Sequence, residues 1–304
     1  MGTWYNIIFK EEHKNTGDLA KVIDLRLSSL NQNLSTYIEQ SDLNQLNRSS
    51  SDGCVEVSDD TAAVMKEALR IYNLSNGAFD PGLGPLIELW GFDKKDTHEM
   101  IPNEGSIQEM LTKLTFGKSE LNEQKQCIKK GSSDLAINFS AIAKGYAVDE
   151  LAEVLEKRYG IKNYLVEIGG EVKVKGNNNQ GKPWRIAIEA PDPSSRTVQK
   201  IVNPGIMGVA TSGDYRNYFE KDGKRYSHTI NPVTGYPIDH QLASVTVIHP
   251  SAMTADALAT AFMVLGDKIG YELAEKNKIA VFMIIKTADG FEEQYNQHFK
   301  PYLN

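Results

Sequence analysis

The order in which helical and strand patterns follow one another most strongly restricts the fold of this chain. A strand pattern at residues 4–9 precedes a long amphipathic helix, in which apolar residues recur at helical spacing from Leu19 to Leu34. After residue 164, alternating segments separated by turns predict antiparallel hairpins, with further helices between them. This order favours an α+β fold with mixed or antiparallel sheets and flanking helices. We expect one domain over residues 1–304, built of two lobes.

The composition excludes several classes of function. Hydrophobic residues make up 40% and charged residues 24% of the 304 positions, which is enough for a sizeable core. The net charge is −7 and no long Lys/Arg cluster occurs, which argues against nucleic-acid binding. No apolar run approaches the ~20 residues that span a bilayer. The two cysteines, Cys54 and Cys127, lack CxxC spacing, so we expect no thiol metal site.

A ten-residue segment from Gly77 to Leu86 is unusually rich in glycine and proline. It contains three glycines and two prolines, so we expect no regular structure there. Phe79 and Leu83 are nevertheless too apolar for a free loop. Such a segment is typical either of a packed corner or of a loop that surrounds a ligand.

A strand-to-helix junction is predicted near residue 140. Residues 136–139 have a strand pattern, and a helix with an apolar face follows from Ala143. The first turn of a helix exposes free backbone N–H groups that favour a phosphate, and Lys144 lies in that turn. The alternative is a solvated lysine without a ligand. Neither GxGxxG nor GxxxxGK[ST] occurs in the chain, so the common nucleotide-binding folds are not supported.

Two oxygen-bearing side chains share one face of a predicted helix near residue 254. Thr254 is the N-cap candidate of this helix. Asp256 and Thr260 are four residues apart and therefore lie side by side. Oxygen ligands suit a hard cation such as Mg²⁺. In the alternative reading, Asp256 only complements the helix dipole and Thr260 packs in the core.

Taken together along the chain, these segments resemble one family, the ApbE-type flavin transferases, which are FAD:protein FMN transferases. The resemblance is carried by Met1–Thr3, Tyr37, Gly77–Pro81, Gly84–Leu86, Leu89–Phe92, Ala143–Asp149, Ile168–Gly170, Ala210–Tyr215, His228, Asn231–Gly235, Ala255–Ala257 and Thr260. The segments occur in the family's order and span nearly the whole chain. The resemblance implies a nucleotide site between the two lobes.

The resemblance also implies a reaction and a set of site residues. FMN would pass from FAD, with Mg²⁺, to a threonine hydroxyl of an acceptor flavoprotein through a phosphoester bond, and AMP would leave. The metal ligands implied are Asp256, Thr260 and the backbone carbonyl of Ala141. The flavin nucleotide would contact Met1, Tyr37, Ala78, Phe79, Asp80, Asn138 and Lys144.

His228 is the candidate catalytic base that the resemblance implies. A threonine hydroxyl is a poor nucleophile unless a base accepts its proton, and histidine titrates near neutral pH. The alternative is a turn histidine bonded to the backbone. Two other functions use the same residues: an FAD pyrophosphatase that releases FMN and AMP, and a non-catalytic flavin-binding module.

Three positions depart from the family pattern, and the first residue bears on location. Asn138 stands where the family usually has Asp, Asn231 replaces a frequent Asp, and Gly82 replaces a more usual Thr. Because Met1 is expected to contact flavin, we expect that an export signal or lipid-anchor segment has been removed. This favours an extracytoplasmic, membrane-anchored protein; a complete sequence would instead be cytoplasmic.

Overall fold

The fold is described from a computed structural model of the chain. The described residues are 2–10, 16–50, 52–92, 101–192, 197–214, 218–221 and 224–303. They form two compact units. Unit 1 comprises Met1–Leu30, Ile142–Gly213 and Gln241–Asn304, and unit 2 comprises Asn31–Ala141 and Asp214–His240.

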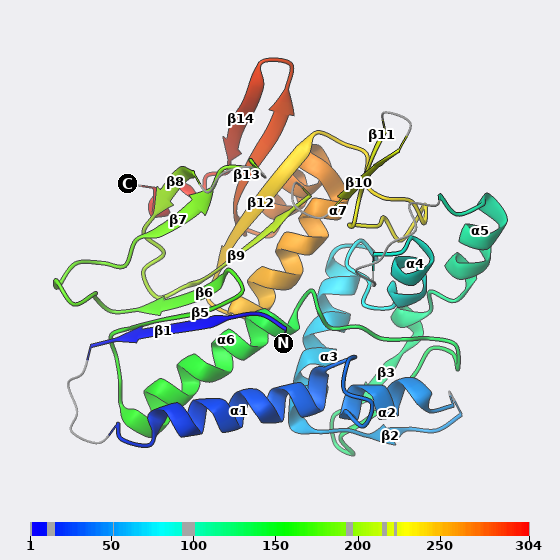
Figure 1. The fold of residues 1–304 in the computed structure, drawn as a ribbon, viewed down its shortest axis with the longest axis horizontal. Helices are drawn as coiled ribbons and strands as arrows, with labels where there is room; N and C mark the ends of the chain where they lie inside the picture. Colours follow the sequence, from blue (N-terminus) through cyan, green and yellow to red (C-terminus); the bar gives the residue numbers. More distant parts are fainter. Residues whose placement is uncertain are drawn as a thin grey trace. The chain divides into compact units, whose positions relative to one another are not determined.

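Unit 1 contains a seven-stranded sheet in which every neighbouring pair of strands is antiparallel (Figure 1). Its strands, in spatial order, are β1 (Tyr5–Phe9), β5 (Tyr164–Ile168), β6 (Glu171–Lys175), β9 (Gly208–Gly213), β12 (Leu242–His249), β13 (Ala280–Thr287) and β14 (Gly290–Tyr295). The first seven of the eight residues of β12 are buried, whichever face of the sheet they point to. The sheet is therefore covered on both faces at its centre.

Helices cover one face of this sheet. The long helix α7 (Ala252–Lys276) packs on β9 and β12, and α6 (Ala143–Glu153) packs on β5, β6 and α7. A π-helical turn (Val154–Arg158) extends α6, and α1 (Leu19–Leu34) is joined to it by the ion pair between Arg26 and Glu150, at 2.6 Å. The opposite face carries a core cluster that includes Phe282 and Phe299.

A small antiparallel sheet adds residues to that cluster. It consists of β7 (Ile186–Glu189) and β8 (Val198–Val202). Ile188 and Val202 join the cluster, and the 3₁₀ helix Lys300–Tyr302 follows Phe299.

Unit 2 is mainly helical with two small sheets (Figure 1). Its helices are α2 (Asp42–Arg48), α3 (Asp59–Leu74), α4 (Gly84–Leu89), α5 (Glu104–Thr112) and the 3₁₀ helix Phe116–Lys118. Its strands are β2 (Val55–Glu56), β3 (Glu120–Asn122) and β4 (Cys127–Lys129) in one sheet, and β10 (Tyr218–Lys221) and β11 (Lys224–Ser227) in the other. A disulfide joins Cys54 to Cys127, 73 residues apart, beside the β2–β4 pairing.

Trp90 organises the core of unit 2 around α4. It is buried in a cluster with Leu86, Ile107 and Ile230. Its indole N–H donates to the carbonyl of Gly235 at 2.8 Å, so the only polar atom of this side chain is satisfied. This bond fixes the loop that follows β11.

The helices predicted over residues 19–34, from residue 143 and near residue 254 are confirmed. Ser58 accepts a hydrogen bond from the N–H of Thr61 and begins α3, and α1 has the predicted bounds. The predicted cap of α7 is wrong: Ser251, not Thr254, is the N-cap, and its hydroxyl accepts the N–H of Thr254 at 3.2 Å. The helix is interrupted at Gly266, whose φ of 77° is not helical.

Two local predictions are corrected. Residues 136–139 alternate between buried and partly exposed side chains as a strand does, yet they form no strand. The backbone N–H of Ile137 bonds instead to the side chain of Asn47. The glycine- and proline-rich segment is partly regular, because α4 begins at Gly84 with Pro85 in its first turn, where no backbone N–H is needed.

Within the described ranges, no helix combines the length and the hydropathy needed to cross a membrane.

Candidate functional site

The first turn of α7 is fixed by a carboxylate from α6. Asp149 accepts hydrogen bonds from the N–H groups of Ala252 and Met253, at 3.1 and 3.0 Å, and from the hydroxyl of Ser251 at 2.7 Å. Its other partner is the ammonium group of Lys173, at 2.6 Å. These bonds satisfy N–H groups that a helix start leaves free, and the negative charge favours that end of the helix. They set the direction of the helix that carries Asp256 and Thr260.

Gly145 allows α6 and α7 to approach closely. A Cβ at this position would lie 2.2 Å from the carbonyl oxygen of Ala252, so no larger residue fits without displacing the backbone. The N–H of Gly145 donates to Oδ2 of Asp256 at 3.0 Å. The position of the Asp256 carboxylate therefore depends on this close contact.

Lys144 lies between two buried carboxylates. Its Nζ is 3.3 Å from Oε1 of Glu171 and 3.7 Å from Oδ1 of Asp256. Burial opposes the charged amine, but the charges of Asp256 and Glu171 outweigh it and raise the pKa of Lys144 above its usual range. Burial, together with the Asp256 charge, raises the pKa of Glu171 to about 8 although Lys144 opposes this.

A tight turn delivers Glu171 to this cluster. Gly169 and Gly170 join β5 to β6 with φ values of 59° and 105°, a pair of positive angles that a two-residue hairpin turn requires. Glu171 is the first residue of β6 and is buried. Its Oε2 is buried and has no hydrogen-bond partner among the described residues.

The oxygen atoms around Asp256 fit a hard cation. Oδ1 of Asp256 lies beyond hydrogen-bond distance from Lys144, and the hydroxyl of Thr260 is 3.3 Å from that of Ser212. Carboxylate and hydroxyl oxygens are the donors that Mg²⁺ accepts. Among the described residues, no group of three or more His, Cys, Asp or Glu side chains could hold a metal. A cation here would therefore rely on few side chains, on backbone oxygen and on other ligands.

In unit 2, the glycine- and proline-rich segment places Asp80 in the interior. Asp80 is 9% exposed and follows the buried residues Ala78 and Phe79. Its Oδ1 accepts the N–H of Gly82 at 2.7 Å. Burial raises the pKa of Asp80 to about 6, and the Gly82 hydrogen bond offsets only part of this rise.

Asn138 is joined to the same segment. Its N–H donates to the carbonyl of Pro81 at 2.8 Å, and its Oδ1 accepts the N–H of Ser140 at 2.8 Å. The second bond closes an Asx turn. Ala141 lies one residue further and ends this stretch of unit 2.

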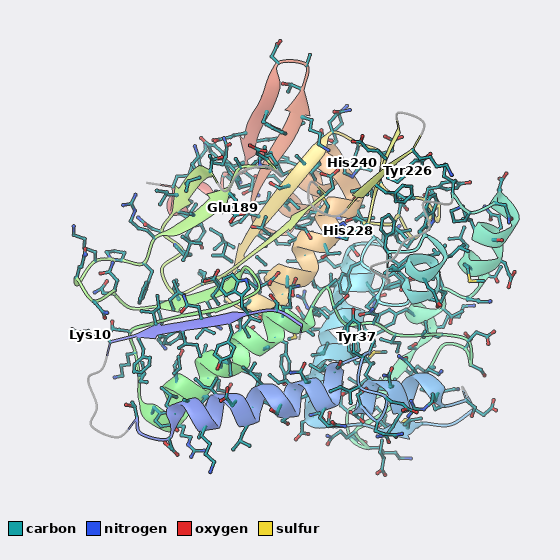
Figure 2. The ribbon with its side chains drawn as sticks, in the orientation of Figure 1. Lys10, Tyr37, Glu189, Tyr226, His228 and His240 are labelled. Atoms are coloured by element: carbon teal, nitrogen blue, oxygen red, sulfur yellow. A yellow bond between two sulfur atoms is a disulfide. The ribbon has the colours of Figure 1, made fainter. Side chains whose placement is uncertain are left out.

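Tyr37 is presented on a rigid loop between α1 and α2 (Figure 2). The tyrosine is 93% exposed. The amide of Asn44 donates to the carbonyls on either side, those of Thr36 and Ile38, both at 2.9 Å. A large exposed ring on a fixed backbone is suited to stacking on a planar ligand.

His228 follows β11 directly and opens the loop that Trp90 fixes (Figure 2). The N–H of Thr229 bonds to the hydroxyl of Ser227 at 3.2 Å, and the N–H of Ile238 bonds to the carbonyl of Thr229 at 2.9 Å. The backbone on both sides of His228 is therefore held in place, and the ring is half-buried.

The predicted residues fall into two groups, one in each unit. Lys144, Asp256 and Thr260 lie together in unit 1. The segment with Ala78, Phe79 and Asp80 contacts Asn138 in unit 2, and Ala141, Tyr37 and His228 belong to the same unit. Met1 lies outside the described residues.

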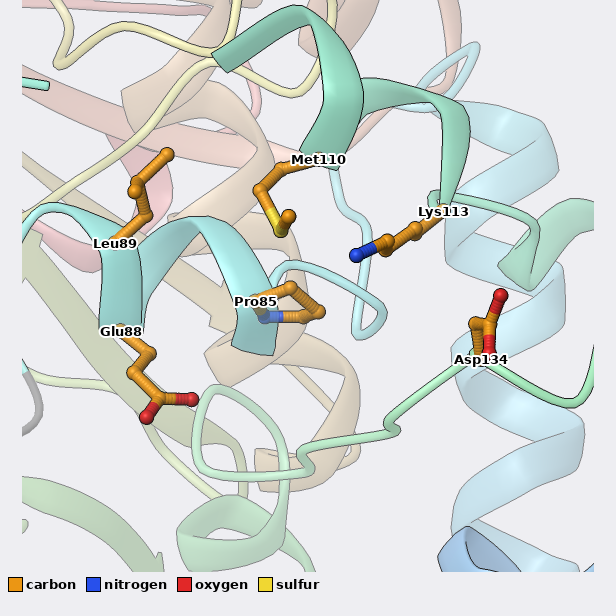
Figure 3. A pocket seen from close by; sticks show the side chains of 6 residues that line it. All are labelled: Pro85, Glu88, Leu89, Met110, Lys113 and Asp134. Carbon is orange, nitrogen blue, oxygen red and sulfur yellow. The ribbon is translucent and has the colours of Figure 1, made fainter. Parts of the chain in front are cut away.

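A separate cavity of about 390 Å³ lies in unit 2 (Figure 3). Pro85, Glu88 and Leu89 of α4 form one wall, and Met110 and Lys113 of the α5 region, with Asp134, form the other. None of the predicted site residues lines it. Its side chains are too mixed in character to indicate a ligand.

Sequence reasoning missed Glu171, Asp149 and Gly145. A glutamate at the start of an alternating strand is ordinary, so its burial has no local signature. Asp149 and Gly145 occur in the helix pattern that also contains Lys144, but their roles depend on contacts with a helix more than 100 residues away.

Comparison with known proteins gives a consistent result. The sequence model of the ApbE family matches residues 1–283. The chain is 44% identical to the FAD:protein FMN transferase of Vibrio cholerae serotype O1 (strain ATCC 39541 / Classical Ogawa 395 / O395), covering 100% of this chain and 91% of that protein. It is 40% identical to the FAD:protein FMN transferase of Escherichia coli (strain K12), covering 100% of this chain and 87% of that protein.

Solved structures agree with these relatives. The flavin transferase ApbE from Vibrio cholerae superposes with a TM-score of 0.91 at 42% identity, covering 100% of this chain and 96% of that chain. The apo form of Pseudomonas stutzeri flavinyl transferase ApbE gives a TM-score of 0.89 at 39% identity, covering 99% and 93%.

Proposed function

This chain belongs to the ApbE family, and from this premise we propose that it transfers FMN from FAD to a threonine hydroxyl of an acceptor protein. The threonine oxygen forms a bond to the phosphorus of the FMN half, and the bond from that phosphorus to the bridging oxygen breaks. The bridging oxygen leaves with AMP. The proton of the hydroxyl passes to the imidazole of His228.

The observation that carries this proposal is the position of Asp256. Its buried carboxylate is held by the N–H of Gly145 and faces Lys144, and Thr260 lies one helical turn further on α7. We assign Asp256, Thr260 and the carbonyl of Ala141 as the residues that would hold Mg²⁺. When bound, the cation would offset the negative charge of the pyrophosphate and of the departing phosphate.

Lys144 would neutralise further charge on the pyrophosphate. Its raised pKa keeps the amine protonated at neutral pH, and Glu171 and Asp256 hold it near the metal ligands. In unit 2, Asp80 and Asn138 would accept or donate hydrogen bonds to the nucleotide, and Tyr37 would stack on a planar ring. Met1, Ala78 and Phe79 complete the proposed nucleotide contacts.

The test combines the protein with FAD, Mg²⁺ and an acceptor protein, and measures the mass of the acceptor. A known flavin transferase runs in parallel. We expect an FMN adduct on a threonine, no adduct with His228→Ala, and unchanged adduct formation with the control His298→Ala. Asp256→Asn should abolish the response to added Mg²⁺.

Three other results would contradict the proposal. An acceptor of unchanged mass would reject the transferase activity if the known enzyme labels it. Free FMN and AMP without any acceptor would identify a pyrophosphatase instead. FAD that stays intact with Mg²⁺ would identify a flavin-binding module.

An extracytoplasmic location is part of the proposal. The disulfide between Cys54 and Cys127 supports it, because structural disulfides persist in oxidising compartments. Fractionation of cells that express the native gene, with detection of the protein in the extracytoplasmic and membrane fractions, tests the location and the predicted lipid anchor. Detection only in the cytosol would contradict both.

A further inference from the structure

Lys130 is a buried lysine without a carboxylate partner among the described residues. It is 2% exposed. Its Nζ donates to three backbone carbonyls, those of Asn47 at 2.7 Å, Ser133 at 3.0 Å and Leu135 at 3.2 Å. An ammonium group has three donors, so all of them are used. Burial lowers the pKa of this lysine, and the nearby charge of Asp134 partly offsets the effect.

Asn47, in the last turn of α2, binds the same segment from another side. Its Nδ2 donates to the carbonyl of Ile137 at 2.9 Å, and its Oδ1 accepts the N–H of Ile137 at 2.8 Å. One side-chain amide thus pairs with both polar groups of one residue, as a neighbouring strand would. The carbonyl of Asn47 also accepts Lys130, so the two residues form one connected clamp.

The clamped segment has no secondary structure of its own to fix it. Residues 131–141 contain no helix or strand, although Leu135, Ile137 and Phe139 are buried. Buried backbone groups require partners. Asn47 supplies them at Ile137, Lys130 supplies a donor to the carbonyls of Ser133 and Leu135, and the carbonyl of Pro81 accepts the N–H of Asn138. The segment carries Asn138 and leads to Ala141.

We infer that Asn47 and Lys130 are positioning residues that fix Asn138 and the Ala141 carbonyl for the flavin nucleotide and its cation. The inference rests on the proposed function, because it assumes that these two residues contact the substrate and the metal. Lys130 and Asn47 themselves are assigned no contact with the nucleotide or the cation. Replacing Lys130 with Met would leave three convergent carbonyls without a donor. Replacing Asn47 with Asp would keep its shape but place an oxygen against the Ile137 carbonyl.

The first measurement is the dissociation constant for FAD, from flavin fluorescence well below the unfolding temperature. We expect Asn47→Asp and Lys130→Met each to weaken FAD binding by about tenfold or more, as expected when a buried polar contact is left unpaired. The matched control is Lys129→Met, because Lys129 is the neighbouring lysine and is exposed. It should bind FAD as the wild type does.

The second measurement is amide hydrogen exchange in peptides that cover residues 132–140. Protection should fall in Asn47→Asp and stay unchanged in Lys129→Met. A core variant in α3, Ile71→Val or Ile71→Ala, is chosen to match the thermal destabilisation of Asn47→Asp. It should retain FAD affinity and the protection of this segment. Lys130→Met is compared only if it folds; Asn47→Asp decides the result otherwise.

Three results overturn the inference. The first is that the Asn47→Asp variant binds FAD as tightly as the wild type does, while the Asn138→Ala variant binds FAD more weakly. The second is an equal loss of affinity in the destabilised Ile71 variant, which would mean that the clamp contributes only stability. The third is wild-type affinity in Asn138→Ala itself, and this result identifies the proposed nucleotide contact as the step that failed.

Discussion

Asp80→Asn should stabilise the ligand-free protein at pH 8 while weakening its binding of FAD. The wild-type carboxyl is buried and, among the described residues, accepts only the N–H of Gly82. Burial raises its pKa to about 6 from the ordinary value of 3.8. The folded state therefore holds this proton more tightly than the unfolded chain does.

The direction and size of the effect follow from this pKa. Between pH 4 and 6 the folded state binds more protons than the unfolded state, so stability decreases as the pH rises through this window. Above about pH 6 the carboxylate is ionised in both states, and the difference of about two pKa units amounts to about 3 kcal/mol at about 1.4 kcal/mol per unit. Asparagine is neutral at every pH and retains an oxygen for Gly82. It should recover most of this free energy.

The assay is thermal unfolding of Asp80→Asn and wild type between pH 3.5 and 8, without ligand. The variant should melt several degrees higher at pH 8. The difference in melting temperature between variant and wild type should shrink as the pH falls from 6 to 4. It should vanish below about pH 4, where Asp80 is protonated in both the folded and the unfolded state. Asp52→Asn is the control, because Asp52 is exposed. A difference in melting temperature that does not change with pH, or no difference at pH 8, would refute the reasoning.

The same variant tests why a costly carboxylate is present. If Asp80 accepts a hydrogen bond from the nucleotide, the Asp80→Asn variant should show a higher dissociation constant for FAD despite its greater stability. Such opposite effects are typical of residues kept for binding rather than for folding. Unchanged FAD affinity would remove Asp80 from the proposed site.

Two further variants test interactions within unit 1 and within unit 2. Gly145→Ala should displace α7 and reduce affinity at the proposed Mg²⁺ site, measured by calorimetry, because its Cβ would lie 2.2 Å from a backbone carbonyl of that helix; wild-type affinity would show that the proposed site does not depend on this close approach of α6 and α7. Cys54→Ser with Cys127→Ser should lower the free energy of unfolding by about 2–4 kcal/mol in denaturant titrations, since the bond joins residues 73 positions apart. Chemical reduction of the wild-type disulfide should lower the free energy of unfolding by the same amount. An unchanged free energy of unfolding in both the double variant and the reduced wild type would contradict the prediction.

Local signals made much of the fold predictable from the sequence. The helical spacing of α1, the Ser58 cap of α3 and the glycine pair between β5 and β6 act over a few residues, so their effects can be read directly. The spacing of Asp256 and Thr260 likewise placed both on α7. The strand prediction for residues 136–139 was wrong for the opposite reason. Their side chains alternate as in a strand, but the backbone of Ile137 pairs with the distant side chain of Asn47 and not with another strand.

The arrangement of the candidate site could be predicted only in part. Residue types and helix spacing indicate Lys144 and Asp256, but the burial of Glu171 follows from the position of a whole sheet around it. The contact of Gly145 with Asp256 joins residues 111 positions apart. Interactions of this kind leave no periodic signal in a single sequence.

Buried charges in this chain differ in how completely they are satisfied, and the difference separates structural groups from candidate ligand groups. Lys130 uses all three donors on backbone carbonyls, so no capacity remains for a ligand. Within the part of the chain that the structure describes, Glu171 has a buried Oε2 without a partner, and Asp80 accepts a single hydrogen bond. An unsatisfied buried carboxylate destabilises a fold unless a ligand completes its hydrogen bonds or its charge. The stability gained from binding FAD and the proposed Mg²⁺ should therefore be smaller in a variant that neutralises Asp80 than in the wild type, because part of that gain comes from relieving the buried charge.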